Sequence, residues 1–162
     1  MGVVTVVAAH VVGSNNGFEP RDMAAVEEFM ARDAANLDWL AQGFAAAREA
    51  GSKAVIVAIH ASMFESGFGP SWAPETWLSH SGFAAFGPAL IAEAASFGGP
   101  VLLVCGDSHR FRQSRPFPAG APNLLALEVP GAEEMHAVRV TATPGAAGLF
   151  SVALLENPAL SN

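Results

Sequence analysis

Residue types that bind metals follow two apolar segments of the sequence. The segment 53–60 ends in His60, and the segment 100–105 is followed by Gly106-Asp107-Ser108-His109. Both segments are typical of strands buried on both faces, and the carboxyl ends of such strands form the ligand-binding edge of open α/β sheets. Two imidazoles and one carboxylate suit Zn, Mn or Fe. We therefore predict a divalent transition-metal site at His60, Asp107 and His109. The alternative is that His60 is a hydrogen-bonded core histidine and that Asp107 caps a turn.

The elements that must position these residues follow from the periodicity of apolar residues. Continuous apolar runs predict a first strand before the glycine-rich segment 13–17 and two more strands ahead of His60 and Asp107. Apolar residues at helical spacing predict a long helix after Asp22, which is a suitable N-cap, and Gly51 is its expected stop. The full set of expected elements is strands 3–12, 53–60, 100–105, 124–129, 136–141 and 149–154, with helices 22–50 and 82–97.

This order predicts an α/β fold with a single mixed β-sheet, parallel in its first part and antiparallel in its last three strands. The chain has 162 residues, which favours one domain over 1–162. Right-handed crossovers place both helices mainly on one face of the sheet. The first three strands are apolar on both sides, so the other face needs a cover. We predict that a second copy of the chain supplies it, as a homodimer.

Composition narrows the classes of partner. Only 14% of the residues are charged, 51% are hydrophobic, and the formal net charge is −7. The few cations form no basic face, so we expect no nucleic acid as partner. No apolar run reaches the ~20 residues of a membrane span, so we expect no membrane partner. The first residues match a core strand better than a signal peptide, and a cytoplasmic location is the default expectation. The single Cys105 excludes an intrachain disulfide.

Several stretches also carry a family resemblance. The segments HVVGSNNG (10–17), VIVAIHASMFE (55–65) and PVLLVCGDSHRFRQSRPF (100–117) are similar to the C-terminal half of calcineurin-like metallophosphoesterases. The segment 32–40 and the closing 129–140 are similar as well. The resemblance implies half of an αββα sandwich. His60 matches the strand-end ligand of that family, and Gly106–His109 matches its Gly-His-Xaa-His motif with Asp107 in place of the first histidine.

The resemblance implies a metal-dependent hydrolase of small-molecule phosphate esters, phosphodiesters or phosphotriesters, in which a metal-activated water attacks phosphorus. It departs from the family where the Asp-Xaa-His, Gly-Asp-Xaa-Xaa-Asp and Gly-Asn-His motifs of the N-terminal half have no counterpart. At most half of a dinuclear site is therefore implied. Further site residues are expected by role: catalytic His10 and His80 for protonation of the leaving group, and substrate-binding Asn15, Asn16, Arg110 and Arg112.

Two other functions are compatible with the same residues. One is a non-catalytic metal-binding or structural remnant of a metallophosphoesterase. The other is a serine esterase of the GDSL type, because Gly106-Asp107-Ser108 resembles its nucleophile block and His136 follows an acidic pair. That family, however, places its serine after the first strand, and too few residues follow Ser108 for the rest of its fold.

Overall fold

A five-stranded mixed sheet forms the centre of the protein. The computed structural model describes residues 4–64, 81–132, 135–145 and 149–160. The strand order is β1-β2-β3-β5-β4, and β1, β2, β3 and β5 run parallel while β4 is antiparallel to β5. The strands are β1 (Val4–Ala8), β2 (Ala54–Ala58), β3 (Val101–Cys105), β4 (Arg112–Ser114) and β5 (Leu124–Glu128). The expected α/β class with a mixed sheet is confirmed.

The direction of β5 differs from the sequence prediction. Residues 124–129 were expected in an antiparallel strand, but β5 lies parallel to β3. The connection 106–123 exceeds the dozen or so residues that a parallel crossover requires, and it contains the short strand β4. The sequence analysis predicted no strand between residues 105 and 124 and so missed β4. The first strand is also shorter than expected: it ends at Ala8 rather than at residue 12.

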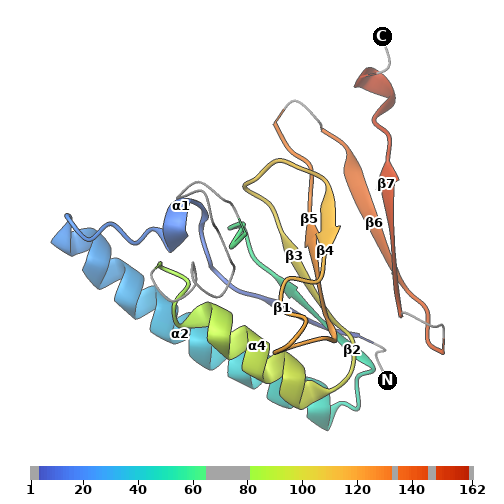
Figure 1. Cartoon of the computed structure of the whole chain (residues 1–162), viewed down its shortest axis with the longest axis horizontal. Helices are drawn as coiled ribbons and strands as arrows, with labels where there is room; N and C mark the ends of the chain where they lie inside the picture. The colour runs from blue at the N-terminus through green and yellow to red at the C-terminus, as the bar shows by residue number, and fades with distance from the viewer. Residues whose placement is uncertain (1–3, 65–80, 133–134, 146–148, 161–162) are drawn as a thin grey trace.

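Both long helices pack on one face of the sheet, as Figure 1 shows. Helix α2 (Met23–Glu49) begins where predicted, because the Asp22 carboxylate accepts hydrogen bonds from the amides of Ala24 and Ala25. Gly51, with a φ of 63°, follows its end. Helix α4 (Phe86–Phe97) begins later than predicted, and Pro88 lies in its first turn, where a missing amide hydrogen costs nothing.

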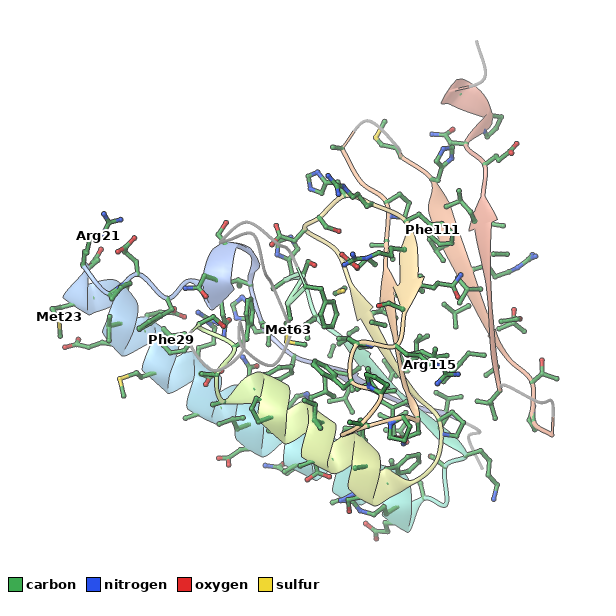
Figure 2. All side chains as sticks on the ribbon, viewed as in Figure 1. Arg21, Met23, Phe29, Met63, Phe111 and Arg115 are labelled. Carbon is green, nitrogen blue, oxygen red and sulfur yellow. The ribbon has the colours of Figure 1, made fainter. Side chains whose placement is uncertain are left out.

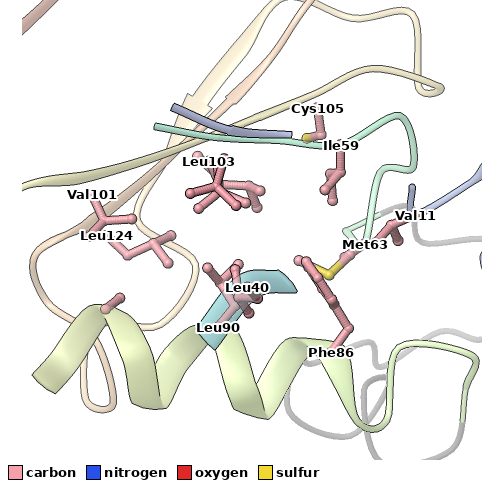
Figure 3. Close-up of a cluster of buried hydrophobic side chains, with 14 of the residues drawn as sticks. Val11, Leu40, Ile59, Met63, Phe86, Leu90, Val101, Leu103, Cys105 and Leu124 are labelled. Atoms are coloured by element: carbon pink, nitrogen blue, oxygen red, sulfur yellow. The ribbon is translucent and has the colours of Figure 1, made fainter. Parts of the chain in front are cut away.

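The core lies between the helices and the sheet. Figure 3 shows Leu40, Phe86 and Leu90 facing Leu103 and Leu124 of the strands. Gly43 allows the close approach of α2 to β1, because a Cβ at this position would overlap the Val7 side chain. Because successive side chains of a strand point to opposite faces, the residues between these core positions lie on the other face of the sheet. There Val6 pairs with Ile56 and Ile56 pairs with Leu102, and all three point away from the helices.

A separate hairpin lies on the side of the sheet opposite the helices (Figure 1). It consists of β6 (Ala137–Ala142) and the antiparallel β7 (Phe150–Leu155), which form a two-stranded sheet of their own. The expectation of a single sheet is therefore wrong in this part. Leu149 and Phe150 line a small cavity together with Leu125 of β5, so the hairpin covers the β5 side of the second face.

The hairpin leaves the β1 side of this face uncovered. Val6 is 63% exposed, Ala8 is exposed, and Ile56, Ala58 and Val104 are partly exposed. We call these five residues the β1 patch. The patch contains no charged group, on a chain whose net charge is −7. A second copy can therefore approach here without bringing like charges together.

We expect Val6→Lys to convert a homodimer into monomers, because two copies of this substitution place ammonium groups inside an apolar interface. Sedimentation velocity across a dilution series measures this change. Met30→Lys is the matched control, since Met30 is 64% exposed but lies on α2, away from the patch. A wild-type chain that is a folded monomer at low micromolar concentration contradicts the expected homodimer.

Candidate functional site

The site is organised around α1 (Gly13–Asn16), a single turn of unusual hand. Ser14, Asn15 and Asn16 have φ values of 52°, 60° and 56°, so three consecutive residues other than glycine lie in the left-handed region. This conformation costs about 1–2 kcal/mol for an ordinary residue such as Ser14, and less for asparagine, whose short polar side chain bonds locally. A turn of this kind persists only where its surroundings determine it.

Hydrogen bonds of the Asn16 side chain hold the turn in this conformation. It is fully buried, and its Oδ1 accepts hydrogen bonds from Arg32 (2.6 Å) and from the amide of Val12 (3.3 Å). Its Nδ2 donates to the carbonyl of Gly82 at 2.9 Å. Arg32 also donates to the Asn16 carbonyl at 2.8 Å. Asn16 therefore ties the turn to α2 and to the segment ahead of α4.

Asn15 has a similar positioning role. Its Oδ1 accepts from the amide of Gly82 at 2.8 Å, and its Nδ2 donates to the carbonyl of Phe18. The sequence predicted substrate contacts for Asn15 and Asn16. The structure shows hydrogen bonds of both amides to groups of the protein, and it places Asn15 on the wall of a cavity. Their predicted contact with substrate stays a prediction.

His60 and Asp107 meet at the start of this turn. The amide of Gly13 donates to His60 Nδ1 at 3.0 Å, and the next amide, of Ser14, donates to Asp107 Oδ2 at 3.3 Å. Asp107 has a φ of 67°. A Cβ on Gly13 would lie 2.7 Å from Asp107 Oδ1, so a larger residue at position 13 would displace this carboxylate. The structure thus brings together two of the three predicted metal ligands.

His109, the third predicted ligand, lies against a different turn. A Cβ on Gly131 would lie 3.2 Å from its Cδ2 atom, so the imidazole packs on the backbone of that glycine. Within the part of the chain that the structure describes, no three His, Cys, Asp or Glu side chains form a group that could hold a metal. His80, a predicted proton donor, lies outside the described residues.

The two side-chain atoms that converge, His60 Nδ1 and Asp107 Oδ2, could serve as two ligands of a cation. His60 Nδ1 and Asp107 Oδ2 both point at adjacent amide hydrogens, which carry partial positive charge. A nitrogen and a carboxylate oxygen are ordinary ligands of Zn, Mn and Fe. They would fill two positions of a coordination sphere that needs four or more. The described residues of one chain therefore fit a metal as two ligands and not as a complete set.

A cavity of about 690 Å³ borders the turn. This volume is typical of small-molecule sites. Its wall is formed by residues of the turn, by Asp107 and Ser62, and by the segment that follows the turn, including Gly17, Phe18, Glu19, Pro20 and Arg21. Figure 2 shows Arg21 near the start of α2, far from the sheet. Arg21 lies 2.9 Å from Glu19, and this hydrogen-bonded pair lowers the pKa of Glu19 to about 2.

A buried carboxylate lies at the same edge of the sheet. Glu128, at the end of β5, is 1% exposed, accepts from Ser62 Oγ at 3.0 Å and pairs with Arg112. The predicted substrate-binding Arg112 thus has a partner in the protein, and neither it nor the exposed Arg110 is among the residues that line the cavity. Sequence reasoning missed Glu128 and Ser62, although the single acidic residue at the end of an apolar strand was a signal.

The remaining polar candidates have simpler surroundings. Asn36 binds both the amide (2.9 Å) and the carbonyl (2.8 Å) of His10, while the His10 imidazole is exposed. Cys105 lies opposite Glu128 in the sheet, and burial, followed by the nearby Glu128, raises the pKa of the Cys105 thiol to about 12. The thiol is therefore protonated and buried, which excludes a nucleophilic role at neutral pH.

The comparisons with known proteins add no relative. Searches against protein-family models, curated proteins and solved structures find no match for this chain. The resemblance described above thus rests on the quoted segments alone. Among the described residues, no helix combines the length and apolar character needed to cross a membrane.

The turn generates a prediction on stability. Asn16→Ala should lower the free energy of unfolding by about 2–4 kcal/mol, because the Val12 amide and the Gly82 carbonyl lose their Asn16 partner and Arg32 loses one of its hydrogen bonds. Ser14→Gly, in the same turn, should be neutral or stabilising by up to about 1 kcal/mol, because glycine adopts positive φ freely. Urea unfolding measures both. Equal destabilisation by the two substitutions would contradict a strained turn held by Asn16.

A second prediction concerns pH. Asp33 of α2 is buried and accepts from Asn16 Nδ2 at 3.4 Å, and burial raises its pKa despite the opposing charge of Arg32. A carboxyl whose folded-state pKa is raised favours folding in its neutral form, and this contribution is lost as pH rises through that pKa. Asp33→Asn keeps an acceptor but cannot ionise. The variant should therefore gain stability relative to wild type between acid and neutral pH, as followed by urea unfolding. A difference that does not vary with pH would refute the assignment.

Proposed function

We propose that this protein hydrolyses small-molecule phosphate esters at the carboxyl edge of its sheet, with a divalent transition metal as cofactor. The observation that carries the proposal is the convergence of His60 and Asp107. They follow the neighbouring parallel strands β2 and β3, and their acceptor atoms point at two successive amides beside a cavity of about 690 Å³. This is the edge at which open α/β sheets bind ligands.

His60 and Asp107 would hold the metal, which is Zn, Mn or Fe in this proposal, and His109 is the proposed third ligand of the metal-bound state. When bound, such a metal polarises a phosphoryl oxygen and lowers the pKa of a bound water. Phosphodiesters and phosphotriesters are the proposed substrates.

The residues around the site have separate proposed roles. The cavity wall of Ser14, Asn15 and Arg21 binds and orients the ester, and Glu19 neutralises Arg21 in the absence of an anion. Arg110 follows His109 directly and is exposed, which leaves its guanidinium available for a phosphate oxygen. His10 is the proposed proton donor to the leaving group, since its imidazole is exposed while Asn36 fixes its backbone.

A second candidate function is binding without catalysis. Two observations favour it: the ligand set of the described residues is incomplete, and the acceptor nitrogen of His60 already has a partner in Gly13. The serine esterase alternative has less support. Ser108 Oγ is buried without a hydrogen-bond partner among the described residues, and His136 Nδ1 accepts from the amide of Asn157.

The test is metal binding and turnover by the purified chain. After dialysis against a chelator, we expect Zn²⁺ or Mn²⁺ to restore both metal content and hydrolysis of bis(p-nitrophenyl) phosphate. His60→Ala and Asp107→Ala should each lower metal affinity by at least about tenfold, because each removes a ligand.

Asp38→Asn is the matched control, since this exposed carboxylate of α2 lies outside the site and should leave both properties unchanged. Metal binding without turnover of any phosphodiester or phosphotriester would favour the non-catalytic candidate. Absence of both metal binding and turnover would contradict the proposed hydrolase.

A further inference from the structure

Asp107 brings an unpaired charge to the wall of the cavity beside the α1 turn. The ion pairs among the described residues are Arg21–Glu19, Arg32–Glu28, Arg48–Glu93 and Arg112–Glu128. Asp107 belongs to none of them, although it lines the cavity of about 690 Å³. Its Oδ2 accepts from the Ser14 amide at 3.3 Å. An ionised carboxylate offers about four lone-pair positions, so Asp107 retains acceptor capacity for a ligand.

The other two charges of the described cavity wall cancel each other. Glu19 and Arg21 both line the cavity, and their side chains lie 2.9 Å apart. The hydrogen bond from Arg21 lowers the pKa of Glu19 to about 2, so Glu19 is ionised at neutral pH and the pair is neutral overall. The wall therefore carries one net negative charge, that of Asp107. The formal charge of the whole chain is −7, which also attracts cations.

Apolar side chains form another part of the same wall. Phe18, Pro20 and Phe83 line the cavity. The ring of Phe18 packs against Phe29, with centroids 4.9 Å apart, and this contact holds the ring in place. Aromatic faces attract cations as well as apolar groups. The wall thus suits a ligand with an apolar body and a positive charge.

Two serine side chains add hydrogen-bond acceptors near this charge. Ser62 Oγ donates its hydrogen to Glu128 at 3.0 Å, so its free lone pair can only accept from a ligand in the cavity. The side chain of Ser14 is exposed on the same wall. Together with the carboxylate of Asp107, these oxygens provide acceptors for several N–H donors.

We infer that this cavity binds a small primary ammonium with an apolar body. Its N–H groups bind the carboxylate of Asp107 and the oxygens of Ser14 and Ser62. Its body packs against Phe18 and Pro20. A primary ammonium has three N–H donors and no acceptor, which matches a wall rich in acceptors. An anion would meet the charge of Asp107, and a neutral ligand would leave that charge unpaired. The inference goes beyond the proposed function and does not depend on it, because no metal takes part.

The experiment measures binding of phenethylammonium to the full chain by isothermal titration calorimetry in the presence of a chelator. The neutral 2-phenylethanol and the anionic 3-phenylpropionate are the matched ligands. We expect the ammonium to bind at least about tenfold more tightly than the alcohol, because hydrogen bonds to charged groups are stronger than neutral ones. The carboxylate should bind most weakly. In ¹⁵N NMR spectra the ammonium should shift the amide signals of Ser14 and Phe18, while Val140 of the hairpin should not respond.

A conservative variant tests the role of the charge. Asp107→Asn keeps a side-chain acceptor for the Ser14 amide, and asparagine tolerates the left-handed conformation at this position, where φ is 67°. The variant should bind phenethylammonium at least about tenfold more weakly than wild type, with little change for 2-phenylethanol. Asp38→Asn removes the same charge from an exposed position of α2 and should leave the affinity unchanged.

The three ligands give decisive outcomes with the wild-type chain alone, so a poorly folded variant does not remove the test. Equal affinity for the ammonium and the alcohol would overturn the inference and indicate an apolar cavity without charge recognition. Tightest binding of 3-phenylpropionate would overturn it in favour of an anion site at Arg21. No binding of the ammonium at millimolar concentration, or shifts confined to residues outside the cavity, would overturn it as well. Hydrolysis of phosphate esters is measured separately, so none of these outcomes decides the proposed function.

Discussion

The buried amide of Asn16 is the interaction on which the rest of the site depends. It joins three segments of the chain: the residues after β1 at Val12, the helix α2 at Arg32, and the approach to α4 at Gly82. Consecutive residues other than glycine in the left-handed region are unfavourable without supporting contacts, so these bonds hold the turn in its conformation. The two amides that meet His60 and Asp107 lie where they do only because the turn is held there.

The sheet supplies the other half of the geometry. Parallel pairing of β2 with β3 places the residues after both strands at one edge, and the pairing of β1 with β2 brings Gly13 to the same edge. Glycine at position 13 then lets the Asp107 carboxylate approach the backbone. Further along this edge, Glu128 has two satisfied oxygens, one bound by Ser62 and one by Arg112. Because Ser62 and Arg112 bind both oxygens of Glu128, this carboxylate forms a fixed ion pair beside the site and does not act as a free base.

The sequence correctly predicted features that depend on residues close together in the chain. Asp22 and Gly51 bound α2 because capping and positive φ depend on neighbours in the chain. Apolar runs located His60 and Asp107 at a shared edge, and the structure brings both to one turn. The sequence alone could not predict features that depend on residues far apart in the chain. Two examples are the direction of β5 and the packing of His109 on Gly131. The roles of Asn15 and Asn16 show the same limit, since nothing near them in the sequence indicates that Gly82 and Arg32 are their partners.

The incomplete ligand set and the uncovered apolar face lie close together in this protein. Ala58 and Val104, which belong to the β1 patch, are only two and three residues from His60 and Asp107 along their strands. Both residues lie at the carboxyl ends of β2 and β3, on the face that neither the helices nor the hairpin covers. A polypeptide that packs on this patch therefore reaches the edge where the two ligands converge. If a second copy packs on this patch as proposed, the layer that buries Val6 and Ile56 would also border the proposed metal site, so the proposed dimer and the missing ligands are parts of one hypothesis.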